Sequence, residues 1–192
     1  MSEPLTTATS ILNPASIVTR YSRRLTKPWK VSNELILFLG VWESGILNGK
    51  NFQRHDVTDG LILTAYTDDR GNPTVGMGHL IVPADRIKVG QAITLERARE
   101  FARRDLEQAS SALHRQVGVP LFQFEFDALV SVAFNCGAGN GIADLVAQVN
   151  NETYEKMFDF IRYYRRGHHR TLAYRRYTEA KMFAAGVYDA SH

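Results

Sequence analysis

The chain has 192 residues, of which 44% are hydrophobic, 22% are charged and 10% are aromatic. These fractions exclude an intrinsically disordered chain, and the length accommodates one full domain with a short appendage. The net charge of +3 excludes a strong polyanion clamp, and the single cysteine, Cys136, excludes a disulfide-stapled scaffold. The composition therefore predicts a folded protein that is made in a reducing cytosol.

The first 30 residues mix Ser, Thr and Pro with scattered Arg and show no apolar period. We predict a linker or tail over residues 1–30 and a folded domain over residues 31–192. The N-terminus lacks the basic start and apolar core of a signal peptide. The longest near-continuous apolar stretch, residues 35–42, is far shorter than the ~20 residues of a membrane-spanning helix, so we expect no transmembrane segment.

The first predicted helix begins at Ser32 or Asn33, either of which can cap it, and ends near Glu43. Apolar residues recur along it every three or four positions, which is typical of a helix that packs on a core. Glu43 is thereby placed at the C-terminal end of an apolar helix. Residues 44–60 are rich in Gly, Asn and charge, and we predict a loop there.

Two apolar, partly β-branched segments flank a turn-forming sequence at residues 68–72 and predict a β-hairpin over residues 61–66 and 73–82. Within the turn, Asp69 fits the turn-forming role better than Asp68. The rest of the chain has helical patterns: residues 94–113 with Thr94 as cap and a Glu100–Arg104 ion pair, the almost wholly apolar segment 124–134, and residues 145–150, 152–164 and 172–185. Together these elements predict an α+β, mostly helical fold.

Three side chains in this pattern have the chemistry of a hydrolytic site. Asp68 on one arm of the hairpin and Thr74 on the other can face the same side and hold a water molecule between them. Glu43, at the end of its apolar helix, is expected to stay protonated because partial burial disfavours the charged form. Two carboxyl groups in unlike environments are what glycoside hydrolysis requires, since one donates a proton to the leaving oxygen and the other activates water.

The sequence from Leu63 to His79 reads LTAYTDDRGNPTVGMGH. It resembles the signature of the phage lysozymes, the muramidases of glycoside hydrolase family 24: a Glu, then Leu-x-x-Tyr-x-Asp, then Gly-x-x-Thr-x-Gly-x-Gly-His. Three later segments resemble the family in the same order, namely TLERAREFARRD at 94–105, FDALVSVAFNCGAG at 126–139 and Arg175-Arg176-x-x-Glu179. The resemblance covers roughly residues 32–190 and identifies residues 31–192 as a lysozyme-like catalytic domain.

This resemblance implies a two-lobed lysozyme-like fold, with a small β-hairpin sheet lobe and a helical lobe. It implies cleavage of the β-1,4 bond between N-acetylmuramic acid and N-acetylglucosamine of peptidoglycan with inversion. Glu43 would protonate the glycosidic oxygen, while Asp68 and Thr74 position water on the opposite face. The residues that would bind the substrate are Phe134, Asn135, Tyr66, His79 and Arg175, of which Arg175 would also orient the acid. Packing is the alternative role for Tyr66 and His79.

One spacing departs from the family, which places about eight residues between the Glu and the Asp, whereas 24 separate Glu43 from Asp68. Either an insertion of 16 residues follows Glu43, which loop entropy tolerates, or Asp59-Gly60 takes the place of the family's Glu-Gly. We favour Glu43, because the polar run before Asp59 supplies no apolar helix to desolvate an acid.

The sequence predicts no metal and no other cofactor, since it contains no HExxH motif and no cysteine cluster. The expected partner is the glycan strand of peptidoglycan rather than nucleic acid, and we expect a monomer. Seven Lys and Arg between residues 162 and 181 would attract anionic peptidoglycan or envelope lipids. Two alternatives remain open: a lytic transglycosylase, which needs one acid and no water site, and a non-enzymatic module that binds nucleic acid or the cell wall.

The resemblance also allows two biological settings. Phage enzymes of this family are endolysins, while related domains end bacteriocins and type VI secretion effectors, for which an immunity protein or the secretion apparatus is a further partner. In both settings the protein is made in the cytoplasm and acts in the periplasm or cell wall of a host or target bacterium. The enlarged segment after Glu43 and the linker-like start favour an effector domain.

Overall fold

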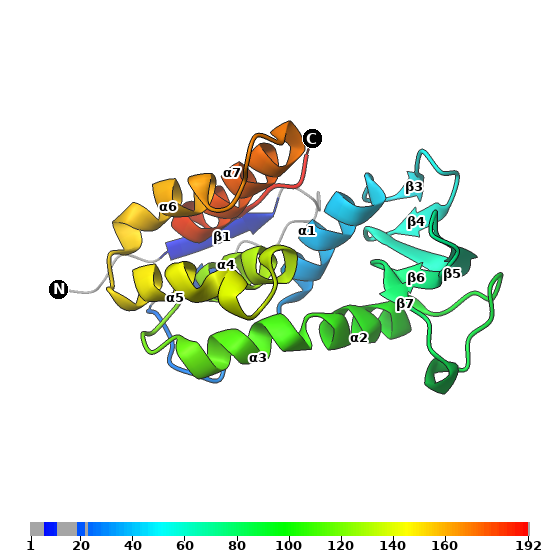
Figure 1. Cartoon of the computed structure of the whole chain (residues 1–192), viewed down its shortest axis with the longest axis horizontal. Coiled ribbons are helices and arrows are strands. Elements are labelled where there is room, and N and C mark those ends of the chain that lie inside the picture. The colour runs from blue at the N-terminus through cyan, green and yellow to red at the C-terminus, as the bar shows by residue number, and fades with distance from the viewer. Residues whose placement is uncertain (1–5, 11–18, 22, 192) are drawn as a thin grey trace. The chain divides into compact units, whose positions relative to one another are not determined.

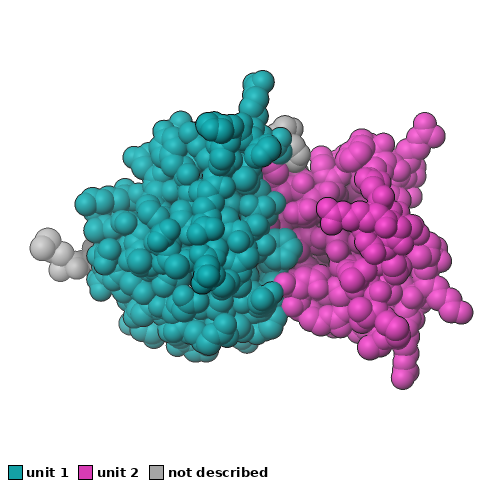
Figure 2. Space-filling view, in the orientation of Figure 1, with its two compact units in different colours: residues 1–35, 106–192 teal, residues 36–105 magenta. Residues whose placement is uncertain are grey.

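The computed structural model describes residues 6–10, 19–21 and 23–191 and divides the chain into two compact units (Figure 2). Unit 1 comprises residues 1–35 and 106–192, and unit 2 comprises residues 36–105. Helices make up most of unit 1, whereas unit 2 contains a small antiparallel sheet of five strands (Figure 1). The predicted α+β, mostly helical fold class is confirmed. Within the described residues, no helix has both the length and the apolar character to cross a membrane.

Helix α1, Asn33–Ser44, begins in unit 1 and continues into unit 2. The predicted cap is confirmed, because the Ser32 hydroxyl oxygen accepts a hydrogen bond from the backbone N–H of Leu35 at 3.0 Å. Its apolar residues are buried through Leu39 and Val41. This buried stripe fixes the helix and carries the chain to Glu43 at the last turn.

The sheet of unit 2 has the strand order β3-β4-β5-β6-β7, and every neighbouring pair is antiparallel. Its strands are β3 Gly49–Lys50, β4 Asp56–Thr58, β5 Leu61–Thr67, β6 Pro73–Gly76 and β7 His79–Leu80. The predicted hairpin is confirmed as β5 and β6. Its second arm is divided into β6 and β7 by Gly76 and Gly78, which adopt positive φ angles of 71° and 92°.

The prediction of a loop over residues 44–60 is wrong in part, because β3 and β4 lie within it. Val57 is buried and pairs with Ile62, while its strand neighbours Asp56 and Thr58 are exposed. Strands of two and three residues bury so little apolar surface that a single residue, Val57, carries the signal. The two strands extend the β5–β6 hairpin into a wider sheet.

The predicted helix at 94–113 is two helices, α2 Leu95–Asp105 and α3 Glu107–Gln116, and the boundary between the units falls between Asp105 and Leu106. Thr94 caps α2 as predicted, with its hydroxyl oxygen 3.2 Å from the backbone nitrogen of Arg97. The predicted Glu100–Arg104 pair is wrong. Glu100 pairs with Arg97 at 3.4 Å, and Arg104 pairs at 2.8 Å with Asp85, a carboxylate delivered by the 3₁₀ turn η1, Pro83–Asp85.

Helix α4, Gln123–Cys136, is the core helix that the sequence predicts, with every residue from Phe124 to Ala133 buried. It packs against α3 and against α7, Arg170–Ala185. The other elements of this part of unit 1 are η2 Asn140–Ile142, α5 Ala143–Asn150, η3 Tyr154–Lys156, α6 Met157–Tyr163 and β8 Val187–Tyr188. Helices α5, α6 and α7 agree with the predicted helices after residue 140, whereas strand β8 is not among the predicted elements.

Described parts of residues 1–30 are built into unit 1. Strand β1, Thr6–Ser10, pairs with β2, Thr19–Tyr21, and with β8 near the C-terminus. Trp29 is buried and stacks on Phe126 at 5.3 Å between ring centroids. The segment that we predict as a linker or tail thus contributes strands and one aromatic anchor to the helical unit.

Candidate active site

Three residues predicted to be catalytic, Glu43, Asp68 and Thr74, all belong to unit 2. Tyr66 connects them. It lies opposite Thr74 in the β5–β6 ladder, and its pKa is raised by burial and by the charges of Asp68, Asp69 and Glu43. The charges of both predicted catalytic carboxylates thus act in the same direction on the pKa of one phenol.

The Asp68 carboxylate is held by the turn that it begins. Its Oδ1 accepts hydrogen bonds from the backbone N–H groups of Asn72 at 2.7 Å and Arg70 at 2.9 Å, and its Oδ2 lies 3.2 Å from the Asn72 amide nitrogen. The Asn72 backbone N–H is the main cause of a lowered Asp68 pKa. The prediction that Asp69 forms the turn is wrong. Asp68 forms it and remains an ionised acceptor.

Thr74 is buried and donates its hydroxyl hydrogen to the backbone carbonyl of Asn72 at 3.1 Å. Its oxygen keeps lone pairs that can accept a hydrogen bond from water. Asn72 therefore orients both members of the predicted water site, since its N–H groups bind Asp68 and its carbonyl binds Thr74. Sequence reasoning missed this residue, although an Asn before Pro73 in a turn is a signal for such a role.

Glu43 lies at the end of α1 with an exposed side chain. The expectation that the apolar helix partly buries this carboxyl group is wrong. Glu43 is exposed although Leu39, one turn earlier on the same face of α1, and the following Ser44 are buried. An exposed acid at the helix end is accessible to a substrate.

Asp59, the alternative acid, has a structural role. Its carboxylate pairs with Arg99 at 2.8 Å, and its backbone N–H donates to the Asn48 side chain at 3.0 Å. The following Gly60 has a φ of 77° and lies so close to Gly40 of α1 that a Cβ there would be 2.8 Å from backbone atoms. The Asp59-Gly60 turn thus holds the sheet against the helix that carries Glu43.

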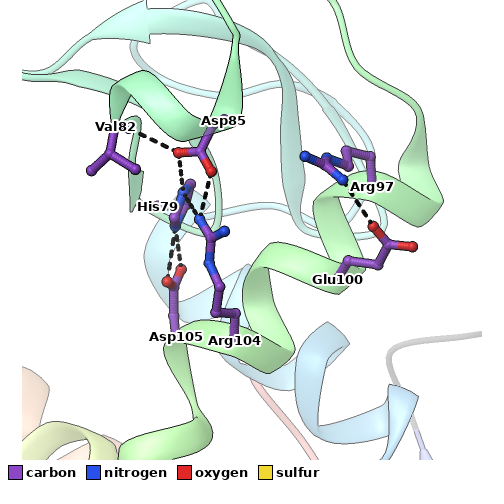
Figure 3. Close-up of polar contacts among 7 residues, drawn as sticks. All are labelled: His79, Val82, Asp85, Arg97, Glu100, Arg104 and Asp105. Atoms are coloured by element: carbon purple, nitrogen blue, oxygen red, sulfur yellow. Dashed lines mark hydrogen bonds and ion pairs between the residues drawn. The ribbon is translucent and has the colours of Figure 1, made fainter.

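His79 is part of a buried polar network between β7 and α2 (Figure 3). Its Nδ1 lies 2.8 Å from Asp105 Oδ1, while its Nε2 lies 2.7 Å from an Arg104 Nη and 3.1 Å from Asp85 Oδ2. The ring also stacks on Phe101 at 4.3 Å and is 6% exposed. The network occupies both ring nitrogens.

Asp85 is the most strongly perturbed carboxyl group of this network. Burial opposes its ionisation, but hydrogen bonds from the Val82 N–H, Arg104 and His79 outweigh that cost and lower its pKa to about 2. Asp85 is therefore charged across the physiological range. It fixes the chain after β7 against α2.

Unit 1 holds the other predicted site residues. Phe134 is half-buried near the end of α4, and the exposed Asn135 accepts a hydrogen bond from Arg176 at 2.5 Å. Arg175 is buried and lies 3.3 Å from Glu179, a carboxylate that Arg176 and Ser131 also bind. The Arg-Arg-x-x-Glu motif is thus a buried ion cluster that holds Asn135. The sequence did not predict that the Ser131 hydroxyl donates to Glu179.

The basic stretch at residues 162–181 does not form one solvated face. Arg175 and Arg176 belong to the buried cluster, and Lys181 pairs with Asp189 at 2.9 Å. Arg165 donates to the Asn140 carbonyl at 3.1 Å. The other three arginines line an open cavity of about 310 Å³, whose lining residues are Arg162, Arg166, Arg170, Ala173, Tyr174 and Tyr177. Among the described residues, no carboxylate forms an ion pair with the three lining arginines. The cavity can receive an anionic group.

The described residues include no group of three or more His, Cys, Asp or Glu that could hold a metal ion. Cys136 is half-buried, with its sulfur 3.1 Å from an Arg176 nitrogen.

A helical unit, an antiparallel sheet and a hairpin that presents Asp68 and Thr74 define a lysozyme-type glycoside hydrolase. The sequence model of the family described as phage lysozyme matches residues 56–179, about two thirds of the chain, and the chain belongs to this family. The match includes Asp68 and Thr74 and begins after Glu43. The predicted enzyme class, a glycoside hydrolase of the muramidase type, is confirmed.

Individual relatives agree with this assignment. The chain is 37% identical over 103 residues to the endolysin of Salmonella phage P22, which covers 53% of this chain and 70% of that protein. It superposes on a mutant P22 lysozyme with a TM-score of 0.62 and 28% identity, over 81% of this chain and 99% of the other. An endolysin from Escherichia coli O157:H7 phage FAHEc1 gives a TM-score of 0.65 over 86% and 99% of the two chains, and at 24% identity it shows the fold alone.

Proposed function

We propose that the protein hydrolyses the β-1,4 bond between N-acetylmuramic acid and N-acetylglucosamine in peptidoglycan, with inversion at the anomeric carbon. The observation that carries the proposal is the pair of Asp68 and Thr74, oriented by one residue, Asn72. Membership of the phage lysozyme family and similarity to phage endolysins support peptidoglycan as the substrate.

In this mechanism Glu43 donates a proton to the glycosidic oxygen as the bond to the anomeric carbon breaks. The ionised Asp68 accepts a proton from a water molecule, and the Thr74 hydroxyl oxygen accepts a second hydrogen bond from that water. The water attacks the face opposite the leaving group, which inverts the configuration.

We propose that Tyr66, Phe134 and Asn135 contact the sugars of the glycan. His79 instead acts as a positioning residue, because both of its ring nitrogens are engaged with Asp105, Arg104 and Asp85. Arg175 stays a prediction as the residue that orients the acid.

The test uses purified peptidoglycan sacculi and mass spectrometry of the released fragments. The wild type should release muropeptides with reducing N-acetylmuramic acid, and early NMR spectra should show the α-anomer first. Fragments that end in 1,6-anhydromuramic acid would establish a transglycosylase instead. A water site at Asp68 and Thr74 favours the hydrolase, since transglycosylation needs no water.

Two variants separate the candidate acids. Glu43→Gln should reduce hydrolysis by about 10³-fold or more, in the range expected for loss of a general acid. Asp59→Asn should retain most of the activity, because Asp59 is used in an ion pair with Arg99. Loss of activity in Asp59→Asn with full activity in Glu43→Gln would reverse the assignment.

We propose that hydrolysis takes place in the periplasm or cell wall of a bacterium. An effector or bacteriocin setting would add an immunity protein that inhibits the enzyme, whereas an endolysin setting would not. Expression directed to the periplasm, with and without the neighbouring open reading frame, distinguishes the two. Rescue of growth by that neighbour would favour the effector, and continued lysis would favour the endolysin.

A further inference from the structure

The β3–β4 hairpin lies in the segment that follows the proposed acid, and its tip comprises residues 51–55. β4 pairs with β5 in the register Val57↔Ile62 and Thr58↔Leu61. Following β4 backward from this register carries the tip toward the end of β5 that leads into Asp68. The tip and the catalytic turn at residues 68–72 therefore lie at the same end of the sheet, whose strands Figure 1 shows.

The tip is held by its own hydrogen bonds. The backbone N–H of His55 donates to the Asn51 side-chain oxygen at 2.9 Å, and the Asn51 N–H donates to the His55 carbonyl at 3.0 Å. A third bond runs from the Arg54 N–H to the Asn51 carbonyl at 2.9 Å. Asn51 is buried, and its amide nitrogen has no hydrogen-bond partner among the described residues. The tip is thus an ordered turn with one buried donor to spare.

His55 links this turn to the site. Its ring lies against the Tyr66 ring, with 4.3 Å between centroids and 37° between planes. Tyr66 lies opposite Thr74 and is influenced by the charges of Asp68 and Glu43. The β3–β4 hairpin therefore contacts strand β5 through the His55 and Tyr66 rings. Tyr66 is the residue whose pKa responds to the charges of the proposed acid and base.

Phe52 is presented to solvent by the same turn. It is 84% exposed, more than any other large hydrophobic residue in the described part of the chain. Single exposed apolar residues are common on proteins, but this ring is carried by a hydrogen-bonded turn beside the site. The faces of hexose rings present C–H groups that pack on aromatic rings, so a glycan strand is the occupant that this position favours.

We propose that the hairpin adds a sugar subsite to the enzyme, in which Phe52 packs on a hexose ring of the strand beyond the cleaved bond. His55 is a positioning residue that holds the tip through the Tyr66 ring. The proposal rests on the proposed peptidoglycan hydrolysis. The insertion between Glu43 and Asp68 then strengthens the binding of long glycan strands.

Kinetics with Phe52→Ala and the matched control Gln53→Ala test the subsite, since Gln53 is exposed in the same turn. On long uncrosslinked glycan strands, Phe52→Ala should lower kcat/KM about tenfold through KM, the loss expected for one unburied ring. Phe52→Trp should restore it, and Gln53→Ala should match the wild type. Equal KM values for Phe52→Ala and Gln53→Ala on long strands would overturn the subsite.

A comparison of single and double variants tests whether His55 acts on substrate binding through Phe52. His55→Ala should raise KM on long strands, His55→Phe should restore it, and the double variant His55→Ala with Phe52→Ala should be no worse than Phe52→Ala. Additive effects of the two substitutions would overturn the positioning role. Thermal unfolding of each variant checks that the fold is retained.

A binding measurement separates this inference from the proposed chemistry. In the Glu43→Gln background, Kd for uncleaved glycan strands should rise about tenfold on Phe52→Ala, whether or not Glu43 is the acid. Wild-type protein that releases no muropeptides but binds strands through Phe52 would overturn only the hydrolysis. Phe52-dependent binding to phosphatidylglycerol vesicles, with an unchanged Kd for glycan, would overturn the subsite in favour of a membrane contact.

Discussion

Asp68 accepts its shortest hydrogen bond, 2.7 Å, from the backbone N–H of Asn72, whose carbonyl in turn accepts the Thr74 hydroxyl. One residue therefore fixes both the proposed base and the hydroxyl beside it. The same hydrogen bond closes the β5–β6 turn. Chemistry and local folding depend on the same carboxylate, and they can be separated by substitution.

Asp68→Asn and Asp68→Ala form a matched pair for this separation. An Asn retains an oxygen that can accept the N–H groups of Arg70 and Asn72, whereas an Ala does not. We expect both variants to lose activity by about 10²-fold or more, because both lack the base. Only Asp68→Ala should also lower the melting temperature, as measured by circular dichroism. A fully active Asp68→Asn would remove Asp68 from the mechanism.

The buried network of His79 predicts an acid-sensitive contribution to stability. The folded state holds the pKa of Asp85 at about 2, below the ordinary value of 3.8. A lowered pKa stabilises the fold above pH 4, and this stabilisation is lost as the pH falls from about 4 to 2. Asp85→Asn should lower the free energy of unfolding by at most about 2 kcal/mol at pH 7, and this difference should disappear near pH 2. Urea unfolding of both proteins across this range provides the measurement, and a constant difference would contradict the prediction.

Asp127 in unit 1 predicts the opposite trend. Complete burial raises its pKa to about 6, although Ser32, Tyr188 and Gln123 donate hydrogen bonds to it. A raised carboxyl pKa stabilises the fold at low pH, and this contribution is lost as the pH rises from about 4 to 6. The stability of Asp127→Asn relative to the wild type should therefore increase over this interval. A relative stability that falls or stays flat in urea unfolding would count against the prediction.

The arginine-lined cavity predicts salt-dependent adsorption to the cell wall. Replacing Arg162, Arg166 and Arg170 together with Gln should weaken binding to sacculi about three- to tenfold at low salt, because unpaired guanidinium groups bind carboxylates. Arg115→Gln is the control, since Arg115 is an exposed arginine in α3. Sedimentation of protein with sacculi measures the effect. Retention on DNA without binding to sacculi would instead favour a nucleic-acid partner.

Local patterns account for the elements that the sequence predicts well. The α1 cap at Ser32, the β5–β6 hairpin and the apolar α4 each depend on residues a few positions apart. The Asp68 and Thr74 spacing is local in the same sense, because the two residues flank one turn. Local patterns of this kind can be recognised in a single sequence without knowledge of the tertiary fold.

Features that depend on distant partners could not be predicted. Arg104 has an acid at Glu100 on its own helix, yet it pairs with Asp85, 19 positions earlier, which a separate turn brings to it. The strands β3 and β4 comprise two and three residues, too few to give a recognisable apolar alternation in the sequence. Glu43 is exposed although it lies one turn after the buried Leu39, so its exposure depends on tertiary contacts that the helical period does not encode.

The close approach of Gly40 and Gly60 holds helix α1 against the sheet at a distance from the tip of the β3–β4 hairpin. The contact lies at the base of the β3–β4 hairpin, where the Gly60 N–H also donates to the Leu47 carbonyl at 2.8 Å. The tip lies at the other end of the strands. Residues can therefore be added, removed or exchanged at the tip while the helix that carries Glu43 keeps its contact with the sheet. The tip is thus a position at which substrate preference can be changed by design.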